Sequence, residues 1–198
     1  EQFQKIFERY GLDGQIYFAR KANKSKSLVK AALEEGIGVD TASFREMEEA
    51  ITFGGGAENL VLTAAVKTQP MVELAIKHNV TIIIDNQDEL KLVQQVAADE
   101  NSIANIGIRL SGFTFEEQKL YSRFGFDIDK DRTQLLSWFS GSSKFHNLLL
   151  TGFHFHLDGY SIEQRGEAIH QTLDFIAEFD SDSNSISFLD ISISLLLK

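Results

Sequence analysis

The sequence of 198 residues contains no cysteine, and this absence excludes several kinds of chemistry at once. Without thiols the chain forms no disulfide, has no thiolate nucleophile and builds no cysteine-ligated metal site. No apolar run approaches the ~20 residues of a membrane-spanning helix. The N-terminus lacks the basic region and apolar segment of a signal peptide, so we expect a cytoplasmic protein. The chain begins with Glu1 in place of Met, which indicates a fragment or a processed chain.

Positive charge is also scarce in this sequence. There are 19 Lys and Arg against 29 Asp and Glu, which gives a net charge of −10. Such a balance argues against nucleic acid and anionic membranes as partners, because both repel an acidic surface. Hydrophobic residues make up 43% of the chain, an ordinary globular proportion. We therefore predict one domain with a sizeable core.

Short β-rich runs alternate along the chain with amphipathic helical segments, which is typical of a parallel sheet. We expect strands at 15–20, 38–41, 59–65, 80–85, 103–110, 148–156 and 186–191. We expect helices at 25–35, from Ser43 to about Gly54, from Pro70 onward, and at 87–98, 133–139 and 161–179. Gly36 is placed to end the first helix, and Ser43 with Glu46 has the capping-box spacing.

The number of strands and their order along the chain favour a (β/α)8 barrel of the TIM type. Such a barrel needs ~250 residues, and about seven βα units are visible here, so the barrel is predicted to be incomplete. An open doubly wound sheet is the alternative. The glycine-rich G-x-G-x-x-G fingerprint of dinucleotide-binding sheets is absent after the first strand, which argues against that fold.

Polar side chains fall at the carboxyl ends of several predicted strands. Alternation along a strand places residues i and i+2 on one face, which pairs Ala19 with Lys21, Gly38 with Asp40, Gly107 with Arg109, and His154 with His156. Asp85 closes the fourth strand and Asp190 lies near the end of the seventh. The mouth of a barrel lined in this way holds a polar ligand. Lysine in such a place can form Schiff bases with carbonyl cofactors.

Simpler interpretations exist for some of these residues. Asp85 and Asp190 are equally well interpreted as caps of the turns that follow them, and Lys67 and Glu46 are expected to be solvated. His154 and His156 have a spacing at which two imidazoles can share a metal ion. No third ligand with clear spacing is evident, so no metal site is predicted.

Six sequence blocks, in order from residue 16 to 156, resemble the fold-type III pyridoxal-phosphate enzymes. This family comprises the diaminopimelate, ornithine and arginine decarboxylases with their alanine-racemase relatives. The segment YFARKAN at 17–23 resembles the family's Y-A-x-K-A-N. The other blocks are GIGVDTAS with Glu46 at 36–46, KT and EL at 67–74, ID and EL at 84–90, SRFG at 122–125 and GFHFH at 152–156. The match is closer to the decarboxylases than to the racemases.

The resemblance implies a decarboxylase that uses pyridoxal 5'-phosphate and acts on an amino acid. It implies that Lys21 forms the internal aldimine, that His156 stacks on the pyridine ring, and that Asp40, Arg109 and Gly159 lie near the cofactor. In this family a C-terminal β-domain completes the site across a homodimer interface, and that domain is absent here. The resemblance therefore implies a homodimer for the full-length protein.

The chain departs from the family pattern in two places. Leu157-Asp158-Gly159-Tyr160 stands where a small Gly-Ser pair is usual, and residues 191–198 stand where a glycine-rich phosphate loop is expected. We therefore expect the 198-residue chain alone to bind the cofactor weakly and to be inactive. An amino-acid racemase and a non-catalytic cofactor-binding relative stay open as alternatives.

Overall fold

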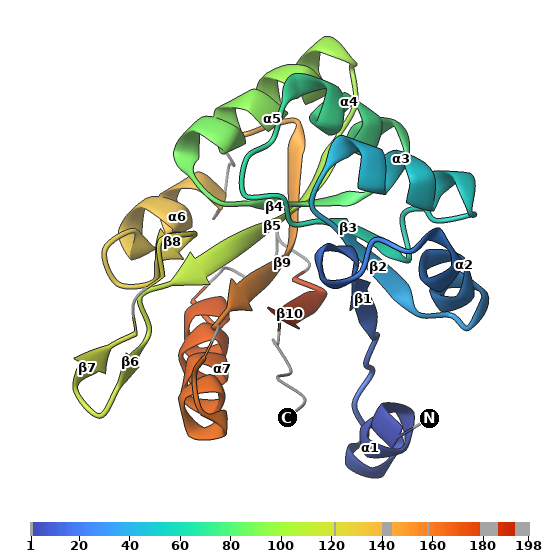
Figure 1. Cartoon of the computed structure of the whole chain (residues 1–198). Helices are drawn as coiled ribbons and strands as arrows, with labels where there is room; N and C mark the ends of the chain where they lie inside the picture. Colours follow the sequence, from blue (N-terminus) through green and yellow to red (C-terminus); the bar gives the residue numbers. More distant parts are fainter. Residues whose placement is uncertain (1, 121, 140–143, 158, 179–185, 193–198) are drawn as a thin grey trace.

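Seven parallel strands, paired in the order of the sequence, form the sheet on which the molecule is built (Figure 1). The computed structural model describes residues 2–120, 122–139, 144–157, 159–178 and 186–192. The strands are β1 (Tyr17–Ala19), β2 (Gly38–Thr41), β3 (Leu60–Leu62), β4 (Thr81–Ile84), β5 (Ala104–Ser111), β9 (Leu148–His156) and β10 (Phe188–Ser192). A doubly wound sheet reverses its strand order part-way, and this sheet does not. The incomplete barrel is confirmed, and the doubly wound alternative is wrong.

Helices cover the outer face of the curved sheet, as Figure 1 shows for the arc from α2 to α5. They are α1 (Gln2–Tyr10), α2 (Lys26–Glu34), α3 (Phe44–Thr52), α4 (Gln69–Lys77), α5 (Gln87–Asp99), α6 (Arg132–Phe139) and α7 (Ile162–Ile176). Each predicted helix is present, with ends displaced by a few residues. The predicted end of the last helix at 179 lies outside the described residues. No helix in the described ranges combines the length and the apolar character that crossing a membrane requires.

The ends of the first two predicted helices follow the expected capping rules. Gly36 has a φ of +72°, and the N–H of Ile37 donates to Ala32 O at 2.8 Å, which closes the end of α2. At the start of α3, Ser43 Oγ accepts from the N–H of Glu46 at 3.3 Å. The Glu46 carboxylate in turn accepts from the N–H of Ala42 at 2.8 Å. Glu46 is therefore a buried cap, and the expectation that it is solvated is wrong.

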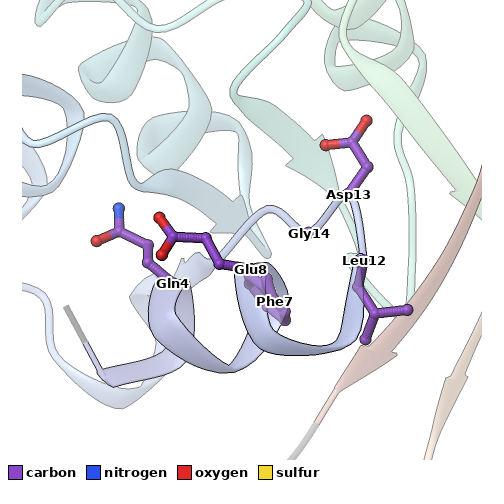
Figure 2. A pocket seen from close by; sticks show the side chains of 7 residues that line it. Gln4, Phe7, Glu8, Leu12, Asp13 and Gly14 are labelled. Carbon is purple, nitrogen blue, oxygen red and sulfur yellow. The ribbon is translucent and has the colours of Figure 1, made fainter.

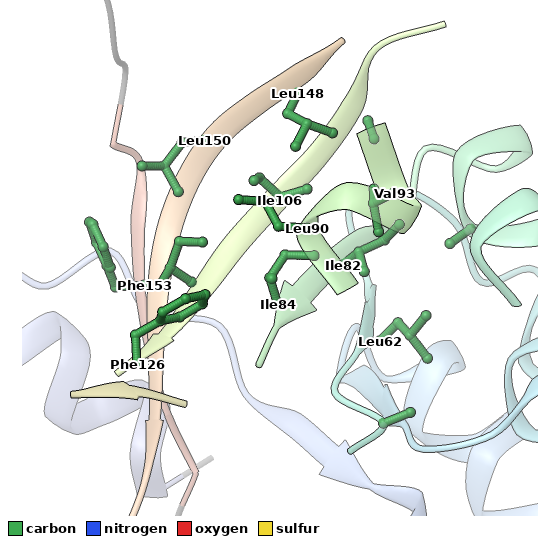
Figure 3. Packing of buried hydrophobic residues seen from close by; sticks show 14 of the residues in the cluster. Leu62, Ile82, Ile84, Leu90, Val93, Ile106, Phe126, Leu148, Leu150 and Phe153 are labelled. Carbon is green, nitrogen blue, oxygen red and sulfur yellow. The ribbon is translucent and has the colours of Figure 1, made fainter. Parts of the chain in front are cut away.

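The hydrophobic core lies between the sheet and the helices (Figure 3). Ile82 and Ile84 of β4 and Ile106 of β5 point outward and pack against Leu90 and Val93 of α5, and all five are fully buried. In β9, Phe153 and Phe155 point the same way, so His154 and His156 face the barrel interior, as alternation predicted. The apolar outer face thus fixes which side chains line the interior.

Glycines on the inner face make room for two aromatic rings from the edges of the sheet. A Cβ on Gly38 would lie 2.5 Å from the ring of Tyr17 in β1. A Cβ on Gly152 would lie 2.5 Å from the backbone oxygen of Phe188 in β10, and one on Gly107 would lie 2.7 Å from Ile83 of β4 and 3.1 Å from the Phe188 ring. Tyr17 and Phe188, together with Ile83, therefore fill the interior below the polar residues of the mouth.

The segment between β5 and β9 contains three short strands that were not predicted. The strands β6 (Thr114–Phe115) and β7 (Gln118–Lys119) form an antiparallel hairpin, which Gln171 of α7 holds through both backbone groups of Thr114. The strand β8 (Phe126–Asp127) pairs in parallel with the end of β5. This pairing brings the segment just before β8 to the carboxyl end of the sheet.

The N-terminal helix α1 stands apart from the layer formed by α2 to α5 (Figure 1). No residue of α1 is buried. A hollow lies between this helix and the loop leading to β1, lined by Gln4, Phe7, Glu8, Leu12, Asp13 and Gly14 among others (Figure 2). Because this loop enters β1 at its amino end, the hollow is separate from the mouth of the barrel.

Candidate active site

Six polar side chains from neighbouring strands meet on the inner face at the carboxyl end of the sheet. They are Asp40, Thr63, Asp85, Arg109, His154 and Asp190, and five of them are buried. Strand pairing places Arg109 beside His154, and His154 beside Asp190. The predicted grouping of Asp40, Arg109 and the histidine strand at one barrel mouth is therefore present. We refer to these six residues as the polar layer.

Arg109 is the centre of one half of the polar layer. Its Nη1 donates to Asp85 at 3.0 Å, and its Nη2 donates to Thr63 O at 2.9 Å. The hydroxyl of Thr63 donates to Asp40, so that Asp40, Thr63, Arg109 and Asp85 form one hydrogen-bonded chain. Thr63 was not among the predicted site residues, although its place two residues after Val61 on the inner face is a usable signal.

The segment just before β8 packs on Arg109. Gly125 has a φ of +86°, and a Cβ there would lie 2.8 Å from the backbone oxygen of Arg109. The Phe124 ring centroid lies 5.7 Å from the guanidinium carbon of Arg109. Only glycine permits this close approach in the left-handed conformation, which gives the SRFG block at 122–125 a physical role.

Lys67 and Glu89 form a buried ion pair behind the polar layer. Lys67 Nζ donates to Glu89 Oε2 at 2.9 Å and to Ala64 O at 2.6 Å. The same Glu89 oxygen accepts from the N–H of Asp85 at 2.9 Å. The expectation that Lys67 is solvated is wrong, because its side chain is wholly buried. Asp85 does not cap the following turn either, since Asn86 accepts from the N–H groups of Asp88 and Glu89.

The other half of the polar layer is a pair formed by His154 and Asp190. His154 Nδ1 lies 2.7 Å from Asp190 Oδ2, and His154 is only 2% exposed. Asp190 lies within β10 and is not a turn cap, so that interpretation is wrong. His156 is half-buried on the same face, one step nearer the carboxyl end, in register with Ser192. In the described ranges, no group of three or more His, Asp and Glu side chains is arranged to hold a metal ion.

Lys21 reaches the mouth from a turn and not from a strand. The predicted strand through Arg20 ends at Ala19, and residues 20–22 form a single turn of 3-10 helix. The turn arises because Arg20 is drawn into the protein, where Nη1 donates to Glu46 O at 2.6 Å and Nη2 pairs with Glu49. Lys21 is consequently exposed, and its face cannot be assigned by alternation with Ala19. Its positive charge still acts on Asp40.

Burial dominates the electrostatics of the acidic groups in the mouth. It raises the pKa of Asp40, against the lowering effects of the Thr63 hydroxyl and the Lys21 charge. It also raises the pKa of Asp85, which Arg109 and Lys67 partly offset. The pKa of Tyr17 is raised by burial and by the nearby Asp190. Tyr17 was not among the predicted site residues, although its spacing of two residues from Ala19 is a usable signal. These shifts identify a water-poor interior that holds several charges.

The remaining predicted position, Gly159, lies just beyond β9. It is exposed and has a φ of +77°. The neighbouring Asp158 lies outside the described residues, as do residues 193–198, where a phosphate loop was expected. The structure therefore describes Gly159 as a turn residue near the mouth.

Nearly the whole chain is similar to a known protein family. A family model described as "Pyridoxal-dependent decarboxylase, pyridoxal binding domain" matches residues 1–192. The uncharacterized protein y4yA of Sinorhizobium fredii is 34% identical over 168 residues, which are 84% of this chain and 35% of that protein. Diaminopimelate decarboxylase of Bacillus methanolicus is 25% identical over 172 residues, 83% of this chain and 39% of that enzyme.

A solved structure has the same fold. The crystal structure of diaminopimelate decarboxylase from M. jannaschi superimposes with a TM-score of 0.75 at 21% identity, covering 89% of this chain and 42% of that one. The chain thus spans between about one third and two fifths of the length of these relatives.

Proposed function

The chain belongs to the pyridoxal-dependent decarboxylases, and on that premise we propose that the complete protein decarboxylates an amino acid of the diaminopimelate, ornithine, arginine or lysine class. The family's cofactor is pyridoxal 5'-phosphate. The observation that carries the proposal is the polar layer at the barrel mouth, in which Arg109 is held by Asp85 and Thr63 and Asp40 lies within reach of the Lys21 charge. We also propose that residues 1–198 are part of the cofactor-binding barrel domain, and that the complete protein is a homodimer.

The groups in the mouth fit this cofactor chemically. The carbonyl group of the cofactor can be held by an amine, and Lys21 supplies an amine at the exposed edge of the mouth. An anionic ligand needs a cation, and Arg109 supplies one whose Nε has no hydrogen-bond partner among the described residues. His154 Nε2 is likewise buried without such a partner in the described part of the chain. Buried polar atoms of this kind are usually satisfied by a ligand or by water.

Each proposed residue has a distinct part in the reaction. When bound, pyridoxal phosphate supplies the electron sink that stabilises the carbanion left by loss of CO₂. The Lys21 amine would hold the cofactor at its carbonyl carbon, and the Asp40 carboxyl, on which the Lys21 charge acts, would balance positive charge there. Arg109, fixed by Asp85 and Thr63, would orient an anionic substituent of the ring, and His156 would pack on the flat face of the ring. Gly159 would leave room for a close backbone approach.

The function is tested by measuring CO₂ release from diaminopimelate, ornithine, arginine and lysine by the complete natural protein with pyridoxal phosphate. At least one of them should be decarboxylated. Loss of chirality at the α-carbon without CO₂ release would establish the racemase alternative. Cofactor binding with neither reaction would establish a non-catalytic relative. The same assay on the 198-residue chain alone tests the expectation that this chain is inactive.

His156→Ala should lower kcat by about tenfold, the value of one aromatic packing interaction. Because His156 is only half-buried, we expect the free energy of unfolding to change by less than about 1 kcal/mol. His154→Ala is the comparison variant, and it should mainly destabilise the protein, because it leaves Asp190 without its imidazole partner. If His154→Ala lowers kcat more than His156→Ala does, at unchanged stability, then His154 and not His156 packs on the ring.

A further inference from the structure

Lys67 and Glu89 are two buried charges to which the proposed reaction gives no part. The Lys67 side chain is 0% exposed and that of Glu89 is 8% exposed. Removing both charges from water is unfavourable, and burial accordingly lowers the pKa of Lys67. A buried ion pair is therefore weak evidence for a gain in stability, and its contacts must be examined for another role.

The pair connects the loops that follow two neighbouring strands. Lys67 Nζ donates to Ala64 O, which holds the loop after β3. Glu89 Oε2 accepts from the N–H of Asp85, which holds the end of β4. One carboxylate oxygen thus receives both Lys67 Nζ and the Asp85 N–H, each at 2.9 Å. The distance between the two loops depends on this oxygen.

The same two loops hold the guanidinium of Arg109. Asp85 at the end of β4 accepts from Nη1, and Thr63 just after β3 accepts from Nη2. These two acceptors fix the plane of the guanidinium, because its donors have a rigid fork geometry. A change in the separation of the loops would therefore rotate Arg109 or break one of its two hydrogen bonds.

We propose that Lys67 and Glu89 are positioning residues for Arg109, which they hold in place through Asp85 and the loop after β3. The inference rests on the proposed function, in which Arg109 orients the cofactor. Lys67 and Glu89 act through Asp85, since both side chains are buried and donate to or accept from protein groups.

The proposal has a consequence for pH dependence, centred on Asp85. The charges that act on Asp85 are Arg109 of β5, Lys67 of the β3–α4 loop, Glu89 of α5 and His154 of β9. Burial raises the pKa of Asp85, and the Glu89 charge raises it as well. The charges of Arg109, Lys67 and His154 lower it. Lys67→Met removes one lowering charge, so the pKa rises further. Protonated Asp85 no longer pairs with Arg109, so acid should weaken cofactor binding at a higher pH in this variant.

The test measures the Kd for pyridoxal phosphate between pH 5 and 8, together with the Tm, in the complete natural protein. Lys67→Met should bind the cofactor about tenfold more weakly, a typical effect along such a network, with the acid-side loss moved to higher pH. Gln94→Leu is the matched control on α5. It breaks the hydrogen bonds between Gln94 and Asn147, which precedes β9 at the opposite end of the barrel. It should lower the Tm and leave the Kd and its pH profile unchanged.

The outcomes separate positioning from a purely structural role. A Lys67→Met protein that loses Tm but keeps the wild-type Kd and pH profile would overturn the proposal. If Lys67→Met does not fold, the double variant Lys67→Met with Glu89→Gln decides, because it removes the Lys67 contacts without leaving the Glu89 charge buried and unpaired, and it keeps an oxygen for the Asp85 N–H. It should also weaken cofactor binding by about tenfold, and an unchanged Kd would overturn the proposal. A wild-type protein that binds no pyridoxal phosphate would instead refute the proposed function.

Discussion

Lys21→Ala is expected to abolish covalent capture of pyridoxal phosphate by the complete protein. After borohydride reduction the wild-type protein should retain the cofactor chromophore through denaturation, and the variant should retain none. Lys67 cannot replace Lys21, because its amine is fully buried and bonded to Glu89. Since Lys21 is exposed, we expect its loss to change the free energy of unfolding by no more than about 0.5 kcal/mol.

The matched control for this experiment is Lys24→Ala. Lys24 is exposed three residues further along, just after the 3-10 turn that carries Lys21. Its replacement removes one amine from the same region and should leave the labelling intact. Peptide mapping that finds the reduced cofactor on any lysine other than Lys21 would refute the assignment.

Arg109→Met should have the largest effect on stability. It leaves Asp85 buried without its main counter-ion, and breaking a buried pair from one side costs about 3–5 kcal/mol. Denaturant unfolding at neutral pH measures this loss. The pKa of Asp85 is already raised by burial, and it rises further without Arg109. A group with a raised pKa in the folded state favours folding when protonated, so the deficit should shrink as the pH falls through that pKa.

The double variant Arg109→Met with Asp85→Asn isolates the charge. It removes both members of the pair, so no unpaired charge stays buried, and most of the lost stability should return at neutral pH. A deficit in Arg109→Met that is the same at pH 4 and pH 7, with no recovery in the double variant, would show that packing and not charge causes the loss.

The strands that local pattern predicts well are those whose two faces differ in chemistry. In β9, Phe153 and Phe155 alternate with His154 and His156, so both the bounds and the faces could be read from the sequence. β1 could not be read in this way. Its end depends on Arg20, whose partners Glu46 and Glu49 lie more than twenty residues away. Distant partners of this kind leave no local pattern.

The residues of the candidate site also fall into those that local sequence pattern predicts and those whose placement depends on distant partners. The placement of Asp40, Arg109 and the histidines could be predicted because each lies near the carboxyl end of a recognisable strand. Lys67 and Glu46 were assigned to solvent because charged residues in loops and on helices are usually exposed. Their burial depends on particular acceptors, Glu89 for Lys67 and the Ala42 N–H for Glu46. Tyr17 and Thr63 lie two residues from Ala19 and Val61, a spacing that the sequence offers, but the contacts they make with neighbouring strands depend on strand register.

The side chains that fill the interior decide where a redesign of this barrel must begin. At the level of these side chains the strands β2, β5 and β9 carry Gly38, Gly107 and Gly152, which have no side chain that a substitution could shorten. The bulk comes from Tyr17 and Phe188 on the two outermost strands of the described sheet and from Ile83 of β4, which would lie 2.7 Å from a Cβ on Gly107. A deeper chamber for a longer substrate therefore requires trimming one of these three side chains, and substitutions at the three glycines can only make the chamber shallower.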